Sequence, residues 1–170
     1  MKVRSSKVMF IALVCVATFL FSCRPSSKSA AQYNNKIITH QVKIVEVQKQ
    51  LNESINKGKA EEMKAILNKF KAEIKNESDS IAAIDGFDGK DNFKKITLNY
   101  LNELSTLSDN EYSSLVKMYE IPDSTFTRDD EKKAQDLLTL IQSKTDNAFK
   151  ALEAEQVKFA NEYNFQVEKK

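Results

Sequence analysis

Apolar residues recur along the chain at the three- and four-residue steps of an α-helix, in four stretches separated by short breaks. The breaks fall at the helix-disrupting residues Gly58, Gly86 with Gly89, and Pro122, and the interiors of the stretches contain neither glycine nor proline. Alternating runs typical of β-strands are nearly absent. The pattern predicts an all-α domain over residues 32–170.

Each stretch has an apolar stripe that is expected to face a common core. The stripe residues are Tyr33, Ile37, Ile44, Leu51 and Ile55; Met63, Leu67, Phe70, Ile74, Ile81 and Ile84; Phe93, Tyr100, Leu104, Leu107, Leu115 and Tyr119; and Leu138, Ile141, Phe149, Leu152, Phe159 and Tyr163. Short connections make sequential helices antiparallel, which predicts an up-down four-helix bundle.

Capping motifs refine the expected helix ends. Thr127 and Asp130 have the spacing of a capping box, with Asp in place of the usual Glu or Gln, and they predict the start of the fourth helix. Ser108 and Glu111 match the same motif in the middle of the third stretch. That stretch could therefore kink or break there, but a continuous helix is the expectation.

Residues 1–22 differ from the rest of the chain. Lys2, Arg4 and Lys7 precede a 14-residue run, 8–21, that carries no charge and is mostly Phe, Leu, Val and Ala. A membrane-spanning helix needs about 20 apolar residues, so the run is short for a span. It predicts a signal peptide that is removed from the mature protein.

The end of this run resembles the lipobox of bacterial lipoproteins. Leu20 lies three residues before Cys23 and the small Ser22 lies just before it, although Phe21 stands where a smaller residue is usual. The resemblance implies cleavage before Cys23 and lipidation of its thiol, with diacylglyceryl and N-acyl chains such as palmitate that hold the protein to a membrane. Residues 23–31 then form the lipidated Cys and a polar tether (RPSSKSAA after the cysteine).

Cleavage also changes the charge and the cysteine content. The whole chain has 26 basic and 24 acidic residues, and three of the basic ones leave with residues 1–22, so the net charge changes from +2 to −1. A basic surface for nucleic acid is therefore not expected. Cys15 also leaves and Cys23 carries lipid, so the domain has no disulfide and its stability must come from a hydrophobic core.

The sequence contains no constellation that predicts catalysis, a metal or a cofactor. His40, the only histidine, lies beside an apolar stripe without ligands at a known spacing, so a packing or surface role is expected. Residues 85–91 superficially resemble a calcium loop, but Phe87 and Lys90 interrupt the ligand pattern. We expect a turn whose Phe87 closes one end of the bundle, and no enzymatic activity.

Four stretches together resemble a family of small helical surface lipoproteins of Bacteroidetes and spirochaetes. They are residues 33–38 (YNNKII), 85–93 (DGFDGKDNF), 110–112 (NEY) and 159–165 (FANEYNF). The resemblance covers about residues 31–165 and implies a helical lipoprotein domain for which no activity is established. The aromatic residues of 159–165 could cap the bundle or form an exposed patch for a partner.

Location and role follow as expectations. Arg24 and Lys28 replace the acidic residues associated with surface display, which favours a periplasm-facing position, and the absence of Asp after Cys23 favours the outer membrane over the inner one. The expected role is a non-catalytic interaction or structural module of the cell envelope that binds a protein or a glycan. The alternative is a carrier of a small apolar ligand, which requires an internal cavity.

The Cys23→Ala substitution tests the anchor. Stable attachment needs more than one acyl chain, because each buried CH₂ contributes only about 0.8 kcal/mol. The variant should therefore be released in soluble form or persist as an uncleaved precursor, as judged by cell fractionation and mass spectrometry. Mature-sized variant protein in the detergent fraction would contradict the assignment.

Overall fold

A computed structural model describes residues 25–167, within which the chain forms five helices and no β-strand. The predicted all-α class is confirmed. The predicted signal peptide, residues 1–22, and the lipidation site Cys23 lie outside the described residues.

The first described helix, α2, spans Ser27–Lys57. The hydroxyl of Ser26 caps it by accepting a hydrogen bond from the Ser29 amide at 3.1 Å, and Ala30 is fully buried. The tether predicted for residues 23–31 is therefore wrong from Ser27 onward. Serine is a favoured cap and Ala30 packs into the core, so this short polar segment begins the helix.

Helix α3, Ala60–Ala82, returns along α2. Gly58 ends α2 with a φ of 69°, a left-handed conformation that glycine adopts without steric cost. Lys69 of α3 donates a hydrogen bond to Gln50 at 3.0 Å, and Glu77 further along α3 meets Lys43. Later residues of α3 thus contact earlier residues of α2, so the two helices run in opposite directions.

The connection after α3 contains a very tight turn. Phe87 and Lys90 exchange two backbone hydrogen bonds of 2.9 Å, and both intervening residues, Asp88 and Gly89, have positive φ. This is the pattern of a type I′ turn, for which Asp-Gly is a favoured pair. The Phe87 ring packs against Tyr33 at a centroid distance of 5.2 Å. The prediction that residues 85–91 form a turn with Phe87 at the bundle end is confirmed.

The third stretch is divided into α4, Asn92–Asp109, and α5, Glu111–Tyr119. The expected continuous helix is wrong: the alternative, a break, occurs at Asn110, although Ser108 does not cap α5. The Ser108 hydroxyl donates to the Ser105 carbonyl at 2.7 Å, within the preceding turn. The Ser113 hydroxyl instead donates to the Ser108 carbonyl at 2.8 Å, a side-chain bond across the interruption.

A lysine of the neighbouring helix stabilises this break. Lys71 of α3 forms an ion pair with Asp109 at 2.9 Å and donates to the Ser113 hydroxyl at 3.1 Å, so it contacts both sides of the break. The interruption therefore depends on a contact between segments about 40 residues apart. The local Ser108–Glu111 motif marked a possible break here, but not the contact with α3 that stabilises it.

The longest helix, α6, spans Arg128–Tyr163, which corresponds to about 54 Å at 1.5 Å per residue. Its predicted capping box is confirmed. The Thr127 hydroxyl accepts from the Asp130 amide at 3.2 Å, and the Asp130 carboxylate accepts from the Thr127 amide at 3.1 Å. Hydrogen bonds from Thr127 lower the pKa of Asp130, which keeps a negative charge at the positive end of the helix.

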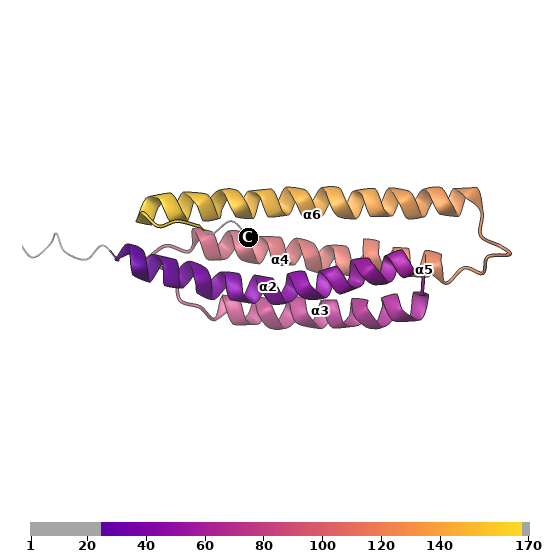
Figure 1. Ribbon diagram of the computed structural model, residues 1–170, viewed down its shortest axis with the longest axis horizontal. Coiled ribbons are helices and arrows are strands. Elements are labelled where there is room, and N and C mark those ends of the chain that lie inside the picture. The colour runs from indigo at the N-terminus through magenta and orange to yellow at the C-terminus, as the bar shows by residue number, and fades with distance from the viewer. Residues whose placement is uncertain (1–24, 168–170) are drawn as a thin grey trace, which may run out of the picture.

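The helices lie side by side along one long axis, with α2 beside α3 and α6 beside α4 (Figure 1). The beginning of α2, the 85–91 turn and the end of α6 share one end of the molecule. Apolar residues of all five helices fill the core between them. The predicted stripe residues are buried or partly buried except Phe149, which is 48% exposed, so its predicted core position is wrong.

An aromatic cluster closes the shared end, with Phe159 at its centre. Its ring lies 4.9–5.7 Å, between centroids, from the rings of Tyr33, Phe87, Phe93, Tyr163 and Phe165. Because Phe165 packs on this cluster, residues 159–165 cap the bundle end. The Tyr163 hydroxyl donates to the Asp88 carboxylate at 3.0 Å, and this bond fastens the turn to α6.

None of the helices in the described part of the chain combines the length and the apolar character that crossing a bilayer requires.

The Phe159→Ala substitution should lower the free energy of unfolding by about 3–5 kcal/mol, because it removes a large buried ring on which five others pack. Phe126→Ala is the matched control, since Phe126 lies in the loop before α6 and is 39% exposed. Urea denaturation followed by circular dichroism measures both. Equal losses in the two variants would refute the central role of Phe159.

Candidate functional site

The contact between α2 and α6 is closed at one end only. At the aromatic end, Gln156 of α6 donates a hydrogen bond to Asn34 of α2 at 2.9 Å, and Tyr33 packs on Phe159. Elsewhere the two helices meet far less than α2 meets α3. The seam between α2 and α6 is therefore the least closed of the long interfaces in the described structure.

Polar residues follow this seam at seven-residue spacing. On α2 they are Asn34, Gln41 and Gln48, and on α6 they are Gln142 and Gln156, with the apolar Phe149 midway between them. Seven residues correspond to two helical turns, so each set occupies one face of its helix. Amides thus occupy positions that apolar residues fill in a tightly closed helix pair.

Beyond the closed end the seam widens into a groove of about 430 Å³, which we call the α2–α6 groove. It is lined by Gln48, Asn52, Ile55 and Asn56 of α2, Tyr112 of α5, and Leu138, Ile141, Gln142, Thr145 and Asp146 of α6. Primary amides form most of the α2 wall. Leu138 and Ile141 make an apolar strip on the α6 wall.

Two polar atoms along the seam are buried without a hydrogen-bond partner in the described residues. One is the hydroxyl oxygen of Thr145, which lines the groove, and the other is the amide nitrogen of Gln41, a residue only 8% exposed. Gln41 shares the helical face of Asn34 and Gln48. Buried polar groups are normally paired, and an unpaired one costs about 1–3 kcal/mol. Both atoms have almost no solvent-accessible area, so a ligand reaches them only when the side chains that cover them move aside.

The floor of the groove contributes a third polar group, the phenol of Tyr112. Burial raises the pKa of Tyr112, and a hydrogen bond with Gln48 partly opposes this. The phenol is therefore neutral at physiological pH, and its hydrogen bond with Gln48 joins the floor to the α2 wall.

Apolar side chains flank the seam between its closed end and the groove. Val45 of α2 is 50% exposed and Phe149 of α6 is 48% exposed. Val45 lies seven residues before Asn52, and Phe149 lies seven residues before Gln156, so both share faces with seam residues. Phe149 is thus exposed because α2 does not cover this face of α6.

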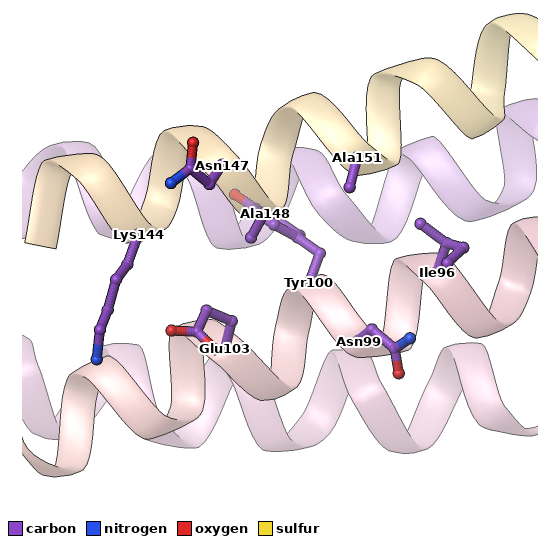
Figure 2. Close-up of a pocket in the computed structure, with 8 residues that line it drawn as sticks. All are labelled: Ile96, Asn99, Tyr100, Glu103, Lys144, Asn147, Ala148 and Ala151. Carbon is purple, nitrogen blue, oxygen red and sulfur yellow. The ribbon is translucent and has the colours of Figure 1, made fainter.

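A second hollow of about 360 Å³ lies between α4 and α6 (Figure 2). In Figure 2, Tyr100 extends from α4 toward α6 beside Ala148, and the small Ala148 and Ala151 leave space there. Burial raises the pKa of Tyr100 to about 12. Lys144 at its edge is paired with Glu111 at 2.7 Å. With its lysine paired and alanines on the facing helix, this hollow is a weaker candidate than the α2–α6 groove.

The predicted candidate His40 forms part of a cluster with a buried carboxylate. Its Nδ1 is hydrogen-bonded to Glu77 of α3, and Lys43 donates to the other carboxylate oxygen at 2.8 Å. The Glu77 side chain is only 6% exposed, whereas that of Lys43 is 51% exposed. Burial raises the pKa of Glu77, but the two hydrogen bonds outweigh it, so the pKa lies below its usual value. The cluster links α2 to α3, which supports the packing role expected for His40.

Sequence reasoning missed Glu77 and the groove residues and overlooked the amide repeat. The heptad of Asn34, Gln41 and Gln48 was visible in the sequence, but apolar periodicity alone did not draw attention to it. Among residues 25–167, no three His, Cys, Asp or Glu side chains are grouped closely enough to hold a metal ion.

The chain matches no protein-family model, no curated protein and no solved structure.

Glu77→Gln should lower the free energy of unfolding at pH 7 by about 1–3 kcal/mol, because it weakens hydrogen bonds to a buried charge. The folded pKa of Glu77 lies below its ordinary value of 4.5, so its charge stabilises the fold above that pH and the contribution is lost as pH falls through the folded pKa. Urea denaturation should therefore show a smaller difference between wild type and variant at pH 3 than at pH 7.

Glu153→Gln, on an exposed position of α6, is the control and should change stability little at either pH. A Glu77→Gln protein as stable as wild type at pH 7 would contradict the proposed contribution.

Proposed function

We propose that the chain is a bacterial lipoprotein held to a membrane through lipid on Cys23, with a helical domain that acts as a non-catalytic interaction module of the cell envelope. The α2–α6 groove is its binding surface. The observation that carries the proposal is this open, partly apolar seam with buried polar atoms that lack partners. The location that we propose is the outer membrane, facing the periplasm, and the resemblance to small surface lipoproteins is part of the same hypothesis.

We also propose that the five helices form an up-down four-helix bundle, in which α4 and α5 together act as one broken helix. Residue pairs support opposite directions for neighbouring helices. Phe93 and Tyr100 of α4 meet Phe159 and Phe149 of α6, respectively. Lys64 of α3 contacts Glu120, just after the end of α5, and Lys71, later in α3, contacts Ser113, near the beginning of α5.

The proposed anchor gives the groove a definite place. Helix α2 begins four residues after Cys23, a stretch of chain that spans at most ~14 Å. The groove residues 48–56 lie 21–29 residues further along α2, which is about 30–45 Å at 1.5 Å per residue. An upright domain would present the groove to the envelope space beyond the lipid headgroups.

The geometry favours an interaction module over the alternative, a carrier of a small apolar ligand. A carrier requires an enclosed apolar cavity. The two hollows described above are both open to solvent at helix boundaries, and polar side chains line about half of the α2–α6 groove. Burying an apolar ligand against these amides would leave their polar groups unpaired.

Site-specific photo-cross-linking tests the proposal. A benzophenone side chain replaces Asn52, in the groove, or Lys150, on an exposed position of α6 outside it, in the full chain expressed in its native host. Irradiation of intact cells should give an adduct at position 52 that is absent at position 150, as detected by gel mobility and mass spectrometry. Identical adduct patterns at both positions, or none at position 52, would contradict the proposal.

A further inference from the structure

We infer that the α2–α6 groove binds a neutral glycan through its amides and the Thr145 hydroxyl. This inference rests on the proposed interaction module and specifies the chemistry of its ligand.

Charge excludes most other ligand classes. The groove lining contains no lysine, arginine or histidine, and its one ionisable carboxylate is that of Asp146. Phosphates, sulfates and carboxylates bind where positive charge or clustered backbone amides compensate them. An anionic ligand would meet only the negative charge of Asp146 here, so an anion is disfavoured, and the uncharged remainder of the lining suits a neutral ligand.

The hydrogen-bonding groups match sugar hydroxyls. Asn52, Asn56 and Gln142 each present a carbonyl acceptor and an NH₂ donor, and Gln48 presents the part of its amide that Tyr112 does not engage. A sugar hydroxyl likewise donates one hydrogen bond and accepts others, so adjacent hydroxyls can bind one amide at both of its atoms. The buried, unpaired Thr145 hydroxyl at the α6 wall can make the same kind of bond once the side chains that cover it shift.

The apolar part of the groove matches the rest of a sugar ring. Ile55, Leu138 and Ile141 lie among the polar residues, and C–H groups on the faces of a pyranose can pack against them. The volume of about 430 Å³ is near the small end of ligand sites and accommodates about two rings. A purely apolar chain would fill this space but leave the four amides unsatisfied.

Thr145→Val is the decisive substitution because it removes a hydroxyl without changing side-chain shape. The hydroxyl is buried and unpaired, so its loss should leave stability unchanged or slightly increased. Binding should weaken by about three- to tenfold, the effect expected of one neutral hydrogen bond. Thr139→Val, at an exposed position of the same helix, is the matched control and should bind as wild type.

The experiment uses the full chain purified in a detergent without a sugar headgroup, such as lauryldimethylamine oxide. The neutral probes are chitotriose, cellotriose and maltotriose with their monosaccharides, and the anionic probe is sialyllactose. Saturation-transfer NMR and calorimetric titration measure binding. We expect at least one neutral sugar to bind more tightly than sialyllactose and to lose affinity in Thr145→Val but not in Thr139→Val.

The outcomes separate this inference from the proposed function. Tighter binding of a trimer than of its monosaccharide supports a glycan chain, and the reverse order supports a free neutral sugar in the same site. Absence of binding to every neutral sugar, or equal binding by wild type and Thr145→Val, overturns the inference. If no sugar binds and the adduct cross-linked at position 52 is a protein, the proposed interaction module is supported. The inference that its ligand is a glycan is then wrong.

Discussion

The packing of aromatic rings around Phe159 sets the register on which the remaining structure depends. This one ring contacts the first turns of α2, the 85–91 turn and the start of α4. It thereby fixes which residue of α2 faces which residue of α6, beginning with Asn34 opposite Gln156. In a domain without a disulfide, this buried aromatic packing takes the place of a covalent link between distant segments.

That register places the amides of Asn34 and Gln156 opposite each other, and further amides of α2 line the groove opposite a mixed polar and apolar wall of α6. Polar residues at such positions reduce the stability of a helix pair but restrict which arrangements it can adopt. The amide nitrogen of Gln41 and the hydroxyl oxygen of Thr145 are buried without partners, so they reduce the stability of this helix pair. Stability supplied by the aromatic end and by the α2–α3 interface permits a seam that contributes little of its own.

Local signals in the sequence were sufficient for the helices and most of the core. The Thr127 capping box and the turn with Phe87 depend on neighbouring residues, and both form as expected. The break at Asn110 was considered but a continuous helix was preferred, because the Lys71 contact from another helix that stabilises the break cannot be read locally. Buried Glu77 was missed for the same reason, since its partners lie 34 and 37 residues away. Phe149 was misplaced because a helical stripe shows which residues share a face but not whether another helix covers that face.

The early start of α2 restricts how the domain can orient itself if Cys23 is lipidated. Only residues 24–26 would separate the lipid from a capped, 31-residue helix that is continuous with the folded core. Such a short linker leaves little rotational freedom, so neighbouring copies in one membrane would hold their grooves at a similar height and tilt. A long polymer running parallel to the membrane could then engage several copies at once, and weak individual contacts would add up to firm attachment through high effective concentration.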